Sequence, residues 1–166
     1  MKIKNRLLVS AAMTMAVGCA AALAQAPSAG DAAAIDAAVA AYLRPSLPKS
    51  GVTFETRVRE GQSWVESRSA ARIAAFARAI NGVPVHRDTV AVCASHSPSS
   101  CTLRNATTLL SFTDAVVTGN SAVVQVMRID LSGIKRIPLN RKEVELHLTR
   151  TAAGWQVTEE RFLSIS

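Results

Sequence analysis

The fold is decided by residues 142–165, which read KEVELHLTRTAAGWQVTEERFLSI. Within this stretch Val144, Leu146 and Leu148 alternate with polar residues, and a two-residue period is typical of a strand with one buried face. A second segment, containing β-branched and aromatic residues, follows the short turn at residues 151–154. The stretch therefore predicts an antiparallel hairpin near the end of the sequence.

Two more segments of the same kind precede this hairpin, at residues 107–117 and 121–129. Thr118-Gly119-Asn120 between them is typical of a tight turn, whereas residues 132–140 form a longer connection to the hairpin. Four consecutive strands joined in this way predict an antiparallel meander. A shorter strand is expected before them, at residues 89–93.

The first predicted helix covers about residues 32–44, with Asp31 as its expected N-cap. Tyr42 lies on the apolar stripe of this helix, so core packing is its expected role. The other members of the stripe are Ile35, Val39 and Leu43. Residues 52–58 follow the helix and alternate strictly, which predicts a half-exposed strand with Val52, Phe54 and Val58 on its buried side.

A second helix is expected after Ser67 or Ser69, either of which can cap it, and Asn81-Gly82 closes it. Arg68 and Arg72 fall on its solvated face, opposite a core stripe formed by Ile73, Phe76, Ala77 and Ile80. Because the helices precede the meander, the predicted fold class is α+β. We expect two N-terminal helices packed on a curved antiparallel β-meander of four long strands, plus one or two short ones.

Residues 1–26 have the pattern of a secretory signal peptide: the basic start MKIKNR, an apolar run and an A-x-A site at Ala24–Ala26. We therefore expect cleavage after Ala26, leaving residues 27–166, the mature chain, as a single domain in the periplasm or outside the cell. Two alternatives stay open. Lipidation of Cys19 is one, because residues 16–19 resemble a bacterial lipobox, and an uncleaved membrane anchor is the other. The mature chain contains no segment that is long and apolar enough to span a membrane.

Cleavage leaves Cys93 and Cys101, which flank the loop CASHSPSSC, as the remaining cysteines. In an oxidising compartment, two such cysteines predict a disulfide. A zinc site that adds His96 and His86 is an alternative, and free thiols are another, whereas a CxxC redox motif is absent. We expect the disulfide, with no metal and no cofactor. The formal net charge of +7 is carried by scattered cations, and aromatic residues make up only 4%, which argues against a nucleic-acid partner.

Candidate catalytic or ligand-binding residues lie on the predicted strands. Asp114, Arg128 and Asp130 interrupt apolar segments, and His147 or Glu145 is placed to act as a general base on the polar side of a strand. Arg128 or His147 is also a candidate polar contact to a ligand. Ion pairs, strand ends and solvated strand faces explain the same residues without a site. No GxSxG, HExxH, P-loop or GxGxxG motif occurs.

Two helices followed by a meander that ends in ELHLTRTAAGWQVTEERFLSI resemble the nuclear-transport-factor-two-like, or SnoaL-like, proteins. The resemblance covers about residues 105–166 and is carried by a strand, Gly-Trp-x-Val, strand signature. It implies a small α+β cone whose bent sheet wraps around a helix and often leaves a pocket. The family contains isomerases, dehydratases and binding modules, so the resemblance implies no single activity. The strand at residues 52–58 and the cysteine loop depart from the family pattern.

Two classes of function remain after this reading. The first is a non-catalytic module that binds a small apolar ligand or an envelope protein. The second is a small pocket enzyme, an isomerase, dehydratase or hydrolase, that uses carboxylate or histidine acid–base chemistry. The observation that separates them is whether Asp114, Asp130 and His147 converge on one concavity. Because no acid–base constellation is assembled in the sequence, we expect the binding module.

Overall fold

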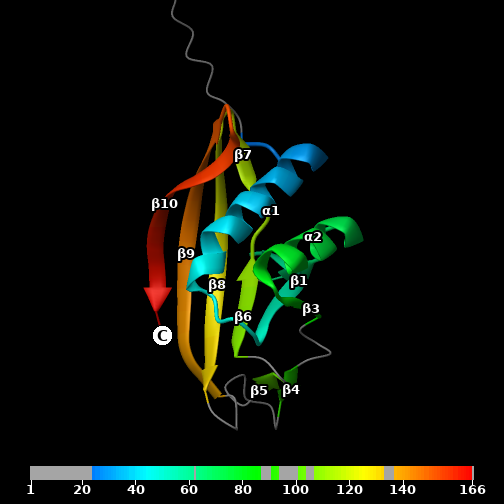
Figure 1. Cartoon of the computed structure of the whole chain (residues 1–166), viewed down its shortest axis with the longest axis vertical. Helices are drawn as coiled ribbons and strands as arrows, with labels where there is room; N and C mark the ends of the chain where they lie inside the picture. Colours follow the sequence, from blue (N-terminus) through cyan, green and yellow to red (C-terminus); the bar gives the residue numbers. More distant parts are fainter. Residues whose placement is uncertain are drawn as a thin grey trace, which may run out of the picture.

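The computed structural model describes residues 24–61, 63–86, 91–93, 101–103, 107–132 and 137–165. It gives only the backbone of residues 91–93, 101–103, 131–132 and 137–139. Two α-helices, α1 (Ala29–Leu43) and α2 (Ala70–Ile80), occur in these ranges, and a 3₁₀ turn η1 (Arg44–Ser46) extends α1. Both helices lie over one face of a large sheet (Figure 1). The predicted α+β class is confirmed.

The described part of this sheet contains eight strands in the order β10-β9-β8-β6-β1-β2, with β3 beside β1 and β7 beside β8. The strands are β1 (Val52–Glu60), β2 (Ser63–Val65), β3 (Val83–Val85), β6 (Thr108–Phe112), β7 (Val116–Thr118), β8 (Ser121–Ser132), β9 (Ile137–Thr151) and β10 (Gly154–Ile165). Strands β6, β8, β9 and β10 pair with one another in this order, and each of these three pairings is antiparallel, as in a meander. Strand β1, however, runs parallel to both β6 and β3, so the sheet is mixed rather than wholly antiparallel.

The strand predicted at residues 107–117 is divided in two. Its first part, β6, ends at Phe112, and its second part, β7, begins at Val116. Both parts pair with β8, so the chain leaves the ladder for three residues and then rejoins the same neighbour. Strand β9, in contrast, is longer than expected, because it includes residues that the sequence assigned to the preceding connection.

A separate two-stranded sheet joins β4 (Ala91–Cys93) to β5 (Cys101–Leu103). The antiparallel register places Cys93 directly opposite Cys101. The side chains of both cysteines, and the whole of His96, lie outside the described residues. The disulfide therefore stays a prediction.

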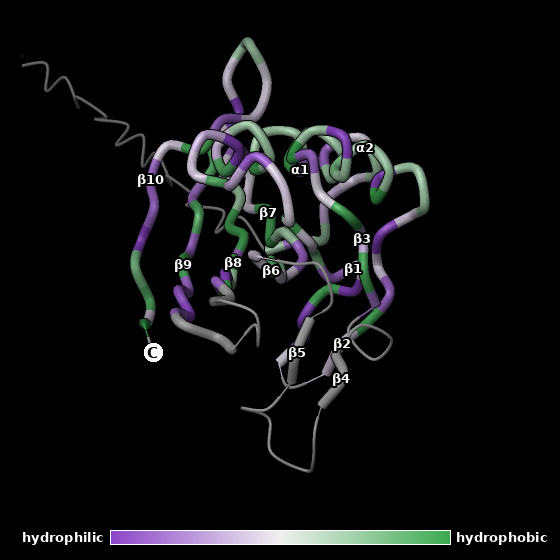
Figure 2. The backbone as a smooth tube through the Cα atoms, turned by 60° about the horizontal axis from the view of Figure 1, so that its bottom comes forward, coloured by the Kyte–Doolittle hydropathy of each residue, from purple (hydrophilic) through white to green (hydrophobic). Residues whose placement is uncertain are grey.

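The hydrophobic core lies between the helices and the sheet. Apolar and polar residues alternate along β8 and β9, so that one face of each strand packs under the helices (Figure 2). Three phenylalanines form the centre of the core: Phe76 of α2 makes edge-to-face contacts with Phe54 and Phe112, with ring centroids 5.2 and 5.1 Å apart. The fully buried side chains that β1, β6, β8 and β9 contribute to the core include Phe54, Leu110, Phe112, Val126, Leu146 and Leu148.

Helix α1 begins earlier than predicted, because Ser28 rather than Asp31 is its N-cap. The Ser28 hydroxyl accepts a hydrogen bond from the Asp31 amide at 3.2 Å. The Asp31 carboxylate instead accepts hydrogen bonds from Arg150 and from the indole of Trp155. The core role expected of Tyr42 is wrong: its side chain is 40% exposed, and its hydroxyl donates to Glu160 at 2.9 Å.

The solvated position predicted for Arg68 is also wrong. Ser69 caps α2, so Arg68 precedes the helix and the helical period does not apply to it. Its side chain is only 3% exposed and lies over the rings of Phe112 and Phe76, at 4.9 and 5.7 Å. Burial lowers the pKa of Arg68, although Asp36, 3.7 Å away, opposes this change.

Strand β1 is more buried than a half-exposed strand should be. The side chains of Thr53 and Glu55, expected to face solvent, are both buried. The Thr53 hydroxyl donates to the Thr108 carbonyl at 3.1 Å, and Glu55 accepts from the Arg57 guanidinium at 3.2 Å. The physical reason is position: β1 lies inside the sheet, between β6 on one side and β2 and β3 on the other.

Candidate functional site

A groove of about 690 Å³ lies on the sheet face opposite the helices. It is placed there by the strand period, because its lining residues Val123, Gln125 and Glu145 alternate with the buried residues of β8 and β9. We call it the outer groove. Its lining consists of Ala24, Gln25, Ala26, Arg59, Glu60, Thr113, Asp114, Ala115, Val116, Val123, Gln125 and Glu145.

The groove owes its shape to the break between β6 and β7. At this break the Thr113 amide donates to the Gln125 carbonyl at 3.0 Å, and the Thr113 hydroxyl accepts from the Gln125 amide at 2.9 Å. A side chain thus replaces one backbone group of the ladder, and the regular pairing of β6 with β8 stops at this point. The next residue, Asp114, is held in the groove wall by a hydrogen bond of 3.0 Å from the Ser67 hydroxyl.

The last three residues of the predicted signal peptide, Ala24–Ala26, form another part of the wall, and we call them the leader end. Gln25 makes an isolated antiparallel bridge with Val117 of β7, with N–O distances of 2.8 and 3.0 Å. Ala24, Gln25 and Ala26 are all exposed. The expected cleavage site is therefore an accessible, extended segment laid along the edge of β7.

Carboxylates outnumber cations in the described lining of the groove. Glu60, Asp114 and Glu145 contribute three, against the single guanidinium of Arg59. Arg59 is itself paired with Glu143 at 3.1 Å and donates through Nε to the Gly61 carbonyl at 3.0 Å. The groove thus combines a mildly acidic rim with an apolar part formed by Ala115, Val116 and Val123.

His147 is not part of the groove lining, but it contacts Glu145, which is. Its Nε2 lies 2.7 Å from the Glu145 carboxylate, and both side chains are about a quarter exposed. On the neighbouring strand β10, a hydrogen bond from Arg161 is the main cause of a lowered pKa of Glu159, and the charge of His147 adds to it. The histidine therefore lies beside the charged side chains of Glu145, Glu159 and Arg161 on the outer sheet face.

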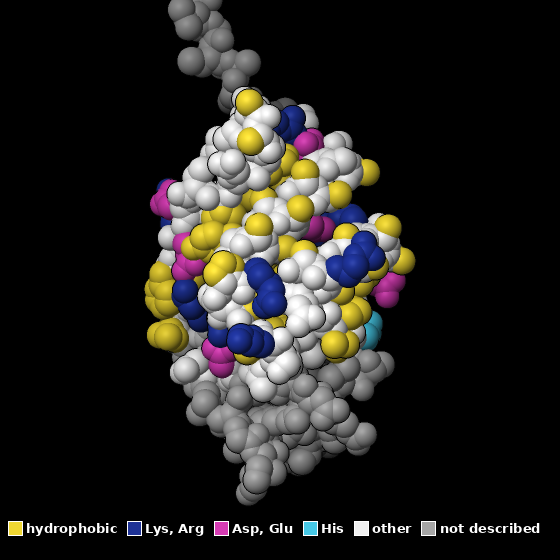
Figure 3. Space-filling view, viewed as in Figure 1, with side chains coloured by type: hydrophobic (Ala, Val, Ile, Leu, Met, Phe, Trp, Pro, Cys, Tyr) yellow, Lys and Arg dark blue, Asp and Glu magenta, His cyan; other side chains and the backbone are white. Residues whose placement is uncertain are grey.

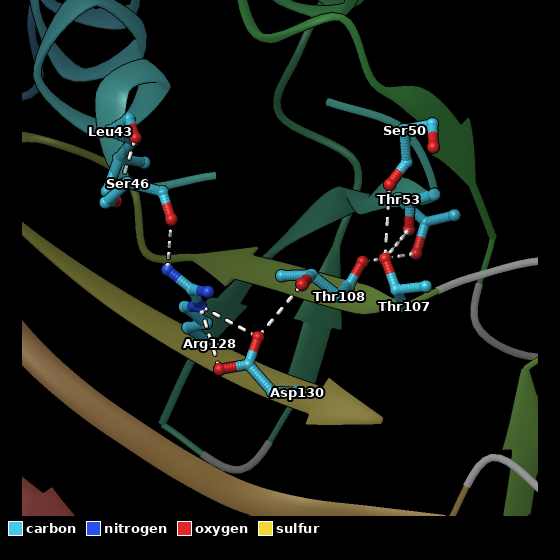
Figure 4. Close-up of polar contacts among 9 residues, drawn as sticks. Leu43, Ser46, Ser50, Thr53, Thr107, Thr108, Arg128 and Asp130 are labelled. Atoms are coloured by element: carbon cyan, nitrogen blue, oxygen red, sulfur yellow. Dashed lines mark hydrogen bonds and ion pairs between the residues drawn. The ribbon is translucent and has the colours of Figure 1, made fainter. Parts of the chain in front are cut away.

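Asp130 and Arg128 lie on the other face of the sheet, with the helices (Figure 4). Asp130 accepts from Arg128 Nε and from the Thr108 hydroxyl, both at 2.9 Å. Arg128 also donates to the Ser46 carbonyl at 3.0 Å. These contacts connect β8 to β6 and to η1, which is a structural role.

The three acid–base candidates do not converge. Asp114 lines the outer groove, His147 lies beside it, and Asp130 projects from the opposite face. Sequence reasoning missed the contributions of Arg59, Gln125 and the leader end. The two-residue period of β8 already indicated the face of Gln125, but no local pattern indicates which distant segments line that face. Within the described ranges, no group of three or more His, Cys, Asp or Glu side chains is arranged to hold a metal ion.

Comparison with known proteins adds no assignment. No family model, curated protein or solved structure matches the chain. Among the described residues, no helix is long and apolar enough to cross a membrane. The face that carries the helices has Lys and Arg side chains spread among apolar and acidic ones (Figure 3). The outer groove is thus the feature from which a function has to be argued.

Proposed function

We propose that the protein is an exported, non-catalytic binding module and that the outer groove is its ligand surface. The observation that carries the proposal is the combination of a concave volume of about 690 Å³, in which Ala24–Ala26 form one wall before cleavage, with apolar residues and a few separated polar groups. Ligand sites generally have this composition. A small apolar ligand fits Ala115, Val116 and Val123, and a segment of an envelope protein fits the same surface along β7.

Export and cleavage after Ala26 belong to the same proposal. In support, Ala24–Ala26 are exposed and extended, as a segment that enters a peptidase has to be. Cys19, the site of the alternative lipidation, lies outside the described residues. We also propose the disulfide between Cys93 and Cys101. Directly opposed residues on antiparallel strands have Cα atoms about 4.5–5.5 Å apart, which is within the range that a disulfide spans.

Membership of the nuclear-transport-factor-two-like superfamily is likewise a proposal. In support, both helices lie on one face of a sheet that ends in the strands β8, β9 and β10. The second candidate function, a small pocket enzyme, is favoured by one observation only. The 2.7 Å contact between His147 and Glu145 places an acid–base pair at the rim of the groove.

The proposed function is tested by filling the groove. Val116 lines it and is 52% exposed, whereas Val83 is 60% exposed on β3 and is absent from the lining. Val116→Trp and Val83→Trp are therefore matched variants of the mature chain. In a fragment screen followed by amide NMR, we expect ligands to shift the Val123 and Gln125 amides in the Val83→Trp protein but not in the Val116→Trp protein. Absence of such shifts in the unsubstituted mature chain, or equal shifts in both variants, would contradict the proposal.

A further inference from the structure

In the described part of the chain, one edge of strand β7 is covered by the leader end alone. Both backbone groups of Val117 bond to Gln25, so they point away from β8, the partner on its other side. No other described strand pairs with this edge of β7. Ala24 and Ala26 flank the bridge and form groove wall at the same place. The segment Ala24–Ala26 thus lies along β7 like an added strand, and it pairs with β7 through one residue, Gln25.

Cleavage after Ala26 would remove this added strand. The N–H and C=O of Val117 would then be open at an edge of the sheet, next to a groove that has lost part of its wall. An open edge strand beside a groove for alternate side chains is the arrangement by which proteins take up an extended peptide. Main-chain hydrogen bonds then supply affinity, and the groove supplies specificity.

We propose that the mature protein binds an extended segment of a partner protein as an antiparallel strand on β7, and that its own leader holds this position until cleavage. This inference rests on the proposed function and names the partner of the same groove. The leader end shows which side chains fit: small residues flank the pairing residue, as Ala24 and Ala26 flank Gln25. The carboxylates of Glu60 and Asp114 favour a basic residue over an acidic one beside this small-x-small pattern.

The experiment uses the leader end itself as the probe. The peptide acetyl-AALAQA-amide, which copies residues 21–26, is titrated into the isotope-labelled mature chain. We expect the Val117 amide to shift and its hydrogen exchange to slow. A matched peptide with a methyl group on the backbone nitrogen of the Gln25 equivalent keeps every side chain but lacks the donor to the Val117 carbonyl. It should bind about tenfold more weakly, because one backbone hydrogen bond is lost.

A longer protein tests the regulatory part of the proposal. In a chain that begins at Ala24, the tethered segment competes with the peptide at an effective concentration of roughly millimolar. We expect the apparent peptide affinity of this protein to be lower than that of the mature chain, by a factor of one plus the ratio of this effective concentration to the dissociation constant of the segment. Equal affinity in the two proteins would show that the leader end does not block the site, and would overturn this part.

The outcomes separate the inference from the function on which it rests. Equal binding of the methylated and unmethylated peptides, shifts that map away from β7, or no binding at millimolar peptide would each overturn strand addition. If fragments still shift the Val123 and Gln125 amides in a way that Val116→Trp abolishes, the groove remains a binding site and only the strand-addition mode is wrong. If neither peptide nor fragments bind, the proposed function fails as well.

Discussion

Asp36→Asn removes the negative charge that faces the most deeply buried cation in the described part of the chain. The Arg68 side chain is 3% exposed, and its Nη2 lies 3.7 Å from the Asp36 carboxylate. Its Nε and Nη1 are buried without a hydrogen-bond partner. Asp36 therefore provides most of the compensation that this guanidinium receives, together with the faces of the rings of Phe76 and Phe112.

The expected loss of stability follows from these distances. Two unit charges about 4 Å apart attract each other by about 4 kcal/mol at an effective dielectric constant of about 20. Removal of one partner from a buried pair costs about 3–5 kcal/mol, because the other charge stays buried. Arg72 also loses a 2.9 Å bond to Asp36, but its side chain is partly exposed and can turn to water. We expect Asp36→Asn to lower the free energy of unfolding by about 3 kcal/mol.

Arg68→Met is the companion variant. Methionine keeps most of the packing against Phe76 and Phe112 and removes the desolvated charge. Its free energy of unfolding should lie within about 1 kcal/mol of the unsubstituted protein. In the double variant, Asp36→Asn should then cost much less than it does alone.

Urea unfolding of the mature chain at pH 7, followed by tryptophan fluorescence and circular dichroism, measures all four proteins. The reasoning would be refuted if Arg68→Met destabilised the protein as much as Asp36→Asn does. It would also be refuted if the two substitutions had additive effects, because additivity would mean that the two groups do not interact in the folded state.

Three further predictions concern processing, pH and catalysis. The intact mass of the exported protein should equal that of the mature chain less two hydrogens, for a Cys93–Cys101 disulfide; a diacylglyceryl mass or two free thiols would contradict this expectation. A hydrogen bond from Lys142 holds the pKa of Glu160 below its ordinary value of 4.5. The resulting stabilisation is present above the unfolded-state pKa and is lost as pH falls through the lowered folded-state pKa, so Glu160→Gln should flatten the acid limb of a stability–pH curve. His147→Ala should leave ligand binding within about threefold, whereas loss of a measurable turnover in a folded variant would favour the enzyme.

The sequence predicted the elements whose signals are local. The β9–β10 hairpin follows from the alternation of Val144, Leu146 and Leu148, which all lie in the core. Helix α2 begins after Ser69 and ends at Asn81, whose φ of 54° is the left-handed conformation that closes a helix. Such features depend on residues within a few positions of one another, so a single segment contains the information that they need.

Tertiary structure decided the environment of each candidate side chain. The alternation along each strand indicates that Asp130 lies on the apolar side of β8 and that His147 lies on the polar side of β9. Only the register between the strands, however, places the two residues on opposite faces of one sheet. Arg59 and the leader end reach the outer groove because β1 pairs in parallel with β6, more than fifty positions away in the chain, and because Gln25 bridges to Val117. No short window of sequence encodes such pairings.

Arg68 shows, at a single residue, the same difference between what local sequence indicates and what tertiary packing decides. The helical period placed it on the solvated face of the second helix, because charged residues are mostly exposed. The structure buries it because α2 packs against β6, which places the rings of Phe76 and Phe112 on one side and Asp36 of α1 on the other. The sequence by itself determined the helices, the hairpin and the alternating faces, since these follow from local periodicity and capping. Only the packing of distant segments determined which polar groups are buried, which of them pair, and where a groove is left open.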